Sequence, residues 1–154
     1  MGYAVPRAVV EAFYTAYATR DAPALSALLH DDVVWTISGP VEILSYCGTH
    51  RGKATVLDLI IRVVPSMFRV ISYVPEAMLV EGERVAMLNR RSAQSKADGK
   101  VISYRVANFM RFRDDKLVEN LSLLDSFDAA EQVLGHPLTL HSNPSANRGR
   151  VVAI

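Results

Sequence analysis

RVAMLNRRSAQSKADGKVISYRVANFMRFRDDKLVENLSLLDSFD, residues 84–128, is the stretch that decides the fold of this chain. Its pattern predicts three long strands joined by short turns at residues 97–100 and 114–116. Between the turns, aliphatic and aromatic side chains alternate with polar ones, as in antiparallel strands whose two faces differ. The stretch therefore predicts an antiparallel meander, and such a sheet needs a second layer against one face.

The middle strand shows which face is which. One face carries the neutral set Tyr104, Val106, Asn108 and Met110. The opposite face carries Arg105, Ala107, Phe109 and Arg111. We assign the neutral set to the interior, because strand side chains alternate between faces. Asn108 then lies among apolar neighbours, and a buried amide has to be hydrogen-bonded by the protein or by a bound molecule.

Length and composition restrict the function classes. The chain has 154 residues, half of them hydrophobic, which fits one domain with its own core. Its net charge of +1 gives no electrostatic footprint for nucleic acid or for an anionic membrane, so we expect neither partner. The first residues do not resemble a secretory signal, and the longest apolar run is too short to span a bilayer. We therefore expect a soluble, cytoplasmic protein.

Cysteine and histidine usage argues against a metal or redox centre. Cys47 is the only cysteine, which excludes an internal disulfide and a CxxC site and suits a reducing compartment. His30 stands beside Asp31 and Asp32, but no second histidine or cysteine follows at ligand spacing. We expect no metal and no cofactor.

Outside the meander, the sequence predicts an N-terminal half rich in helices. Helical spacing and proline positions predict helices at 6–19, 22–29 and 53–64, the last ended by Pro65. Strands are expected at 33–38 and 68–80, where Pro75 indicates an edge or a bulge. A last helix is expected at 129–134. Residues 1–135 form the predicted domain, and residues 136–154 a tail that is mobile or bound to a neighbouring subunit.

Three segments resemble a known superfamily. They are FYTAYATRDAPALSALLHDDVVW (13–35), GPVEILSYCGTHRGKATV (39–56) and FMRFRDDKLVENLSLLDSFDAAEQV (109–133). All three resemble SnoaL-like and ketosteroid-isomerase-like proteins of the nuclear transport factor 2-like superfamily. The resemblance implies an α+β fold, a cystatin-like roll in which a cone-shaped, curved antiparallel sheet packs on three N-terminal helices and encloses one pocket. It also implies a homodimer formed through the outer sheet face.

The function implied by the resemblance is binding of a small hydrophobic molecule. We expect cofactor-independent acid/base chemistry of the isomerase, cyclase or hydrolase type on a hydrophobic carbonyl or polyketide-like compound. A noncatalytic binder and a dimeric assembly module stay open, because this fold hosts many functions. Whether the chain is an enzyme is left open at this point.

Family mechanisms transfer only in part. Aligned with ketosteroid isomerase, Phe13 replaces the catalytic tyrosine, Ile37 the aspartate base, and Asn108 the protonated acid of the oxyanion hole. Aligned with limonene-epoxide-hydrolase-like proteins, Asp125 matches one aspartate of an Asp, Arg, Asp relay. Arg90 or Arg91 matches the arginine, while residues 85–96 offer no second acid. In SnoaL-like cyclases a pocket aspartate works as acid or base, and Asp125 matches it as well.

These arguments give a set of candidate site residues. The candidate catalytic residues are Asp125, Asn108 and Arg91, with Arg90 as the alternative arginine. The candidate substrate-binding residues are Trp35, Tyr46, His50, Tyr104, Asn89, Phe13 and Tyr17. An acid beside leucines has its pKa raised by desolvation, which suits Asp125 to proton transfer. The alternatives are a capping carboxylate for Asp125, a surface salt bridge for the arginine, an exposed loop position for His50 and plain core positions for the aromatic residues.

Overall fold

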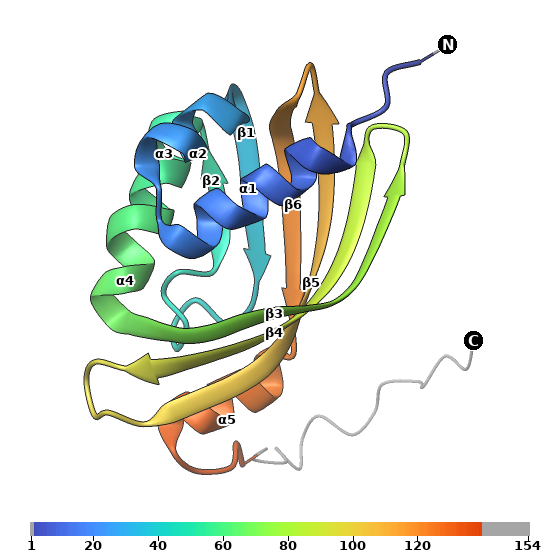
Figure 1. Ribbon diagram of the computed structural model, residues 1–154. Coiled ribbons are helices and arrows are strands. Elements are labelled where there is room, and N and C mark those ends of the chain that lie inside the picture. Colours follow the sequence, from blue (N-terminus) through green and yellow to red (C-terminus); the bar gives the residue numbers. More distant parts are fainter. Residues whose placement is uncertain (1, 140–154) are drawn as a thin grey trace, which may run out of the picture.

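The computed structural model describes residues 2–139 of the chain (Figure 1). The N-terminal half contains α1 (Arg7–Thr19), α2 (Ala22–Leu28), β1 (Leu29–Ser38), β2 (Gly48–Arg51), α3 (Lys53–Asp58), the π-helical turn η1 (Leu59–Val63) and α4 (Val64–Met67). The C-terminal half contains β3 (Phe68–Glu81), β4 (Arg84–Ser95), β5 (Val101–Arg113), β6 (Lys116–Leu124) and α5 (Ser126–Leu134). The predicted tail falls largely on residues 140–154, outside the described part.

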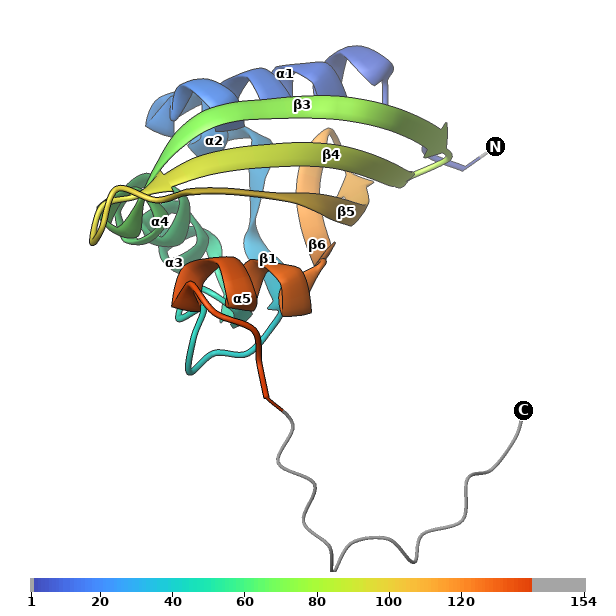
Figure 2. The same ribbon diagram turned by 90° about the horizontal axis from the view of Figure 1, so that it is seen from below.

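All six strands form one curved, open sheet in the order β2-β1-β6-β5-β4-β3. Strands β3 to β6 are the antiparallel meander that the sequence predicts, and this prediction is confirmed. Two features were missed: β1 runs parallel to β6, and β2 lies in the segment expected to be a loop. Figure 2 shows the long strands curving beneath α1, with α5 at the opposite side of the sheet. The α+β cone fold is thus confirmed.

Local sequence explains most of the boundaries. Asp21 caps α2, since its carboxylate accepts from the Ala24 N–H at 3.0 Å. The expected edge or bulge at Pro75 is confirmed: β3 is one of the two edge strands, and its register shifts after that residue. The predicted helix end before Pro65 is wrong. The π turn lets Val64 N–H donate to the Leu59 carbonyl, and Pro65, which has no N–H, stands in the first turn of α4.

The core lies between the helices and the inner face of the sheet. Phe13 of α1 packs edge-on against Phe112 of β5, with ring centroids 6.4 Å apart. The interior assignment of the neutral set is confirmed, because Tyr104, Val106, Asn108 and Met110 are all buried. The buried polar residues of the described chain all lie on this inner face, and they are Asn89, Arg91, Asn108, Asn120 and Ser122. No helix within residues 2–139 is long and apolar enough to cross a membrane.

Candidate functional site

Asn108 is the centre of a buried amide network. Its Oδ1 accepts from Asn89 Nδ2 at 3.0 Å and from the Tyr73 hydroxyl at 3.1 Å. Its Nδ2 donates to Ser122 Oγ at 2.8 Å and to Asn120 Oδ1 at 3.3 Å. The network is therefore held by four neighbouring strands, and Asn108 is satisfied by the protein on both sides of its amide.

Three members of this network, Tyr73, Asn120 and Ser122, are not among the residues predicted from sequence; the two on β6 were placed on the wrong face. Strand β6 alternates polar residues with Leu121 and Leu123, so the hydrophobic pattern places the leucines inside. The structure has the opposite arrangement: Asn120 and Ser122 are buried, and both leucines are exposed. The strand register could have revealed this arrangement. Ser122 pairs with Asn108 across β5 and β6, and side chains of paired residues lie on the same face of the sheet.

An aromatic wall closes the network on the helix side. Tyr17 of α1 stacks on Trp35 at a centroid distance of 6.1 Å and meets Tyr73 at 5.6 Å. Burial raises the pKa of Tyr14 and of Tyr73, so both phenols are neutral hydrogen-bond donors. The wall and the network line a small cavity of about 20 Å³, which is room for a single water. It is lined by Phe13, Tyr14, Tyr17, Trp35, Tyr73, Asn108, Met110 and Asn120.

Two buried polar atoms of the site have no hydrogen-bond partner within residues 2–139. They are the indole N–H of Trp35 and Oδ1 of Asn89. Trp35 lines the cavity and is only 5% exposed. A buried donor without an acceptor costs free energy, so such an atom calls for a bound group.

Arg91 forms a second buried cluster with tyrosines. Its Nη1 donates to the Tyr104 hydroxyl at 2.9 Å, and the Tyr104 and Tyr46 hydroxyls are 3.0 Å apart. The guanidinium carbon lies 5.8–5.9 Å from the ring centroids of Tyr46, Phe68 and Tyr104. This settles the open choice of arginine: Arg91 faces inward, while Arg90 faces outward and bonds Glu76 at 3.0 Å.

A larger hollow of about 400 Å³ opens at the loop end of the cone. Tyr46 and Phe68, two of the rings around Arg91, belong to its wall. His50 lies nearby on β2, opposite Trp35 in the register, with Nε2 3.1 Å from the Tyr46 carbonyl oxygen. Tyr73 pairs with Arg91 across β3 and β4 and also bonds Asn108, so side chains run without a break from the hollow to the cavity.

Asp125 does not join either cluster. The sequence predicts a carboxylate desolvated among leucines, but the face that carries Leu121 and Leu123 is exposed, and so is Asp125. Its carboxylate caps α5 by accepting from the Asp128 N–H at 3.3 Å. The catalytic role of Asp125 stays a prediction, and the geometry supports the capping alternative.

The structure also bears on a nucleophilic cysteine, a metal site and a buried carboxylate as possible catalytic groups. Burial raises the pKa of the Cys47 thiol to about 11, so this thiol is protonated and a poor nucleophile. Within residues 2–139 there is no group of three or more histidine, cysteine, aspartate or glutamate side chains that could hold a metal. Among the buried polar residues named above there is no carboxylate.

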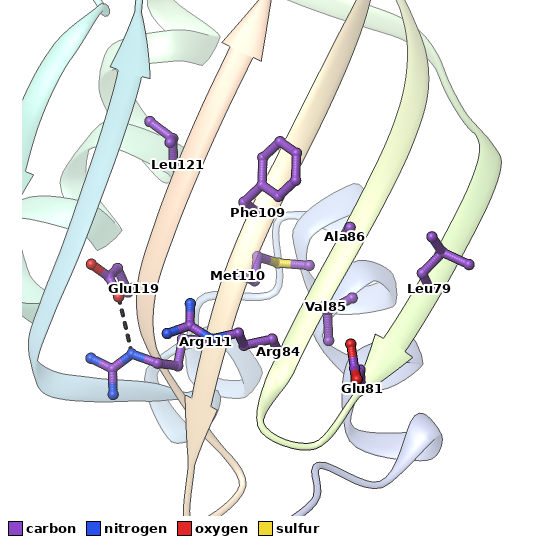
Figure 3. Close-up of a pocket in the computed structure, with 10 residues that line it drawn as sticks. All are labelled: Leu79, Glu81, Arg84, Val85, Ala86, Phe109, Met110, Arg111, Glu119 and Leu121. Atoms are coloured by element: carbon purple, nitrogen blue, oxygen red, sulfur yellow. Dashed lines mark hydrogen bonds and ion pairs between the residues drawn. The ribbon is translucent and has the colours of Figure 1, made fainter.

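The outer face of the sheet carries a hollow of its own, of about 330 Å³ (Figure 3). Exposed apolar side chains line it, with Leu79 72% exposed and Phe109 50% exposed. Arg111 bonds Glu119 at 3.0 Å along one side. Strands β3, β4, β5 and β6 all contribute, so this hollow is a feature of the sheet surface.

Comparison with known proteins places this architecture in a family. The SnoaL-like domain family matches residues 10–120. An isomerase candidate from Rhodopseudomonas palustris is 27% identical, with a TM-score of 0.76 over 83% of this chain and 97% of that chain. An NTF2-like protein from Burkholderia xenovorans LB400 is 25% identical, with a TM-score of 0.70 over 81% of this chain and 92% of that chain.

More distant structures share the fold alone. An LEH-like epoxide hydrolase from M. tuberculosis is 18% identical, with a TM-score of 0.66 over 82% of this chain and 87% of that chain. A search of curated proteins gave no match. Since the family match spans most of the chain and the described elements form the cone fold, the chain belongs to the SnoaL-like domain family.

Proposed function

We propose that this chain binds a small, largely hydrophobic molecule in the interior of the cone and holds an oxygen of that molecule with neutral donors. The observation that carries the proposal is the indole N–H of Trp35, which is buried, lacks a partner within residues 2–139 and borders the cavity beside Asn108. The surrounding aromatic wall supplies apolar contact, and the amide network fixes the polar end.

Binding requires the interior to open. Pockets for small ligands commonly measure about 300–1,000 Å³, while the cavity beside Asn108 measures about 20 Å³. The loop-end hollow already has a suitable volume, about 400 Å³. We infer that a ligand enters there and that aromatic side chains between the hollow and Asn108 change rotamer to admit it. Rearrangements of interface side chains of this kind are common on binding.

The test combines native mass spectrometry with a Trp35→Phe variant. A small molecule should copurify with the wild-type protein, and the variant should bind that molecule about tenfold more weakly, which is the loss of one hydrogen bond to a buried donor. Ligand-free stability should fall as well, because phenylalanine fills less of the buried space that the indole occupies against Phe13 and Tyr17. The affinities are therefore compared under conditions in which circular dichroism shows both proteins folded. Equal affinity of both proteins would contradict the role given to the indole N–H.

A second candidate function is cofactor-independent acid/base catalysis of the isomerase or cyclase type. Its support is the 27% identical isomerase candidate together with His50, whose imidazole contacts the carbonyl of Tyr46, a residue that lines the loop-end hollow. Histidine is the residue type used most often for general acid/base catalysis. Once a ligand is known, turnover that is lost in His50→Gln and kept in Asp125→Asn supports this reading. Turnover lost only in Asp125→Asn assigns the base to Asp125, and binding without product under any condition supports the binder.

We also propose that the outer sheet face pairs with a second copy of the chain. Leu79, Phe109 and Leu121 are exposed together around the hollow of Figure 3, and a contiguous apolar surface of this kind marks an interaction site. Light scattering at micromolar concentration should give a dimer mass. Phe109→Glu should give a monomer, while the control Ile71→Glu, at a residue also 50% exposed, should stay dimeric. A monomeric wild type would reject the pairing.

A further inference from the structure

Arg91 is a buried charge without a carboxylate partner. Only 7% of the residue is exposed, and a guanidinium stays protonated in proteins. All sixteen acidic side chains lie within residues 2–139, and each is exposed or half-buried. None of the ion pairs formed there includes Arg91. Burying an uncompensated charge is costly, so this position has a reason other than stability.

The surroundings of Arg91 leave most of its hydrogen-bonding capacity unused. Among the described residues, its guanidinium makes one side-chain hydrogen bond, from Nη1 to the Tyr104 hydroxyl. The rings of Tyr46, Phe68 and Tyr104 offer cation–π contacts at 5.8–5.9 Å. Aromatic rings attract the charge but do not replace in-plane acceptors. The remaining N–H donors match the forked geometry of a carboxylate.

The loop-end hollow next to this cluster suits an anion with an apolar body. Two of the three rings around Arg91, those of Tyr46 and Phe68, also line the hollow, whereas Arg91 itself is not among the lining residues. The other lining residues are Ile43, Leu44, Ser45, Ser66, Met67, Ser95, Lys96, Ala97 and Val133. Apolar side chains dominate this set, Lys96 adds a second positive charge, and no lining residue is acidic.

We propose that the ligand of this hollow is a hydrophobic organic carboxylate whose carboxyl group pairs with Arg91. This inference rests on the proposed small-molecule function and adds the charge of the ligand. The carboxylate reaches the guanidinium when the Tyr46 ring, carried by the segment between β1 and β2, swings aside. The apolar body then occupies the hollow, and Lys96 at its wall strengthens the preference for a negative charge.

The experiment compares two probes of equal shape, naphthalene-2-carboxylate and naphthalene-2-carboxamide, by isothermal titration calorimetry at neutral pH. Wild-type protein should bind the carboxylate at least tenfold more tightly than the amide, as expected for a charge-assisted pair. Arg91→Met should lose this preference, and Arg91→Lys should retain part of it because the charge stays and the fork is lost. Arg90→Met is the matched control, since Arg90 is the adjacent arginine on the outer face, and it should keep the full preference.

The outcomes separate this inference from the proposed function. Equal binding of both probes by wild-type protein, or a carboxylate preference that survives in Arg91→Met, overturns the carboxylate assignment and leaves small-molecule binding intact. Binding of neither probe also overturns the assignment, and the Trp35→Phe experiment then decides on the proposed function. If Arg91→Met does not fold, the wild-type preference and its partial retention in Arg91→Lys decide the question.

Discussion

The two faces of strands β4, β5 and β6 are made of alternate residues of one sequence, yet they differ in how their polar and charged side chains are partnered. On the inner face, Asn108 is buried and bonded by four neighbours, and Arg91 is caged by rings without an acid. On the outer face, Arg90 and Arg105 share Glu76 in contact with solvent. The inner face avoids negative charge, whereas the outer face balances charge locally.

Hydrophobicity alone would have assigned the two faces of β6 wrongly, and even the correctly assigned β5 carries a large apolar side chain on its outer face. Phe109 and Leu121 point outward, while the adjacent Asn108 and Asn120 point inward. With two amides inside and two large apolar side chains outside, less apolar surface is buried than in the reverse arrangement, which costs stability on both faces. We interpret each cost as a sign of function: the inner face is arranged for a ligand and the outer face for a second copy of the chain.

The largest effect that separates the faces should come from truncating the amide network. Asn108→Ala removes four hydrogen bonds and leaves buried partners unpaired, so the free energy of unfolding should fall by about 3 kcal/mol. Urea unfolding followed by circular dichroism measures this change.

The matched change on the outer face is Arg111→Ala. It breaks one bond to Glu119 in an exposed pair and should cost less than about 1 kcal/mol. Equal losses for the two variants would show that the inner network contributes no more than a surface ion pair, and the comparison of faces would fail.

A smaller effect is expected at Asp125, where β6 gives way to α5. Asp125→Ala removes the cap of the helix and should lower the free energy of unfolding by about 1 kcal/mol. Asp125→Asn should keep nearly all of the stability, because asparagine caps helices as well as aspartate does. A large stability gain in Asp125→Asn would instead indicate that the charge itself is unfavourable where it stands.

The fold could be predicted from sequence because its signals are local. Turns at 97–100 and 114–116, the Asp21 cap and the alternation in β5 each predict an element, and the structure confirms them. The parallel pairing of β1 with β6 could not be predicted from such signals, because the partners are far apart in sequence. The helix that continues through Pro65 could not be predicted either, because a proline after a helical segment indicates a helix end, whereas here the π turn lets a new helical turn begin at Val64.

The site could be predicted less well. The inner-face positions of Asn108 and Tyr104 could be predicted because β5 alternates regularly, whereas on β4 the choice between Arg90 and Arg91 stayed open until the register with β5 was known. Asp125 was placed among buried leucines because β6 breaks the usual rule that leucines face the core. Tyr73 of β3 was missed because the strand shifts register near Pro75, so parity could not be followed along it.

The smallest expected effect is a difference between the two faces in how the stability of their variants depends on pH. Arg105 and Arg90 hold the pKa of Glu76 below its ordinary value through hydrogen bonds and charge. Because the folded state favours the ionised form, the stabilisation by Glu76 is fully present above the ordinary glutamate pKa and is lost as the pH falls through the lowered value. Glu76→Gln should therefore be less stable than wild type at pH 7, and this stability difference should be smaller at pH 3. The inner amides do not titrate in this range, so the difference between Asn108→Ala and wild type should persist at both values. Urea unfolding midpoints of the three proteins at the two pH values measure these differences. If the stability difference between Glu76→Gln and wild type were larger at pH 3 than at pH 7, the sign of the linkage would be wrong.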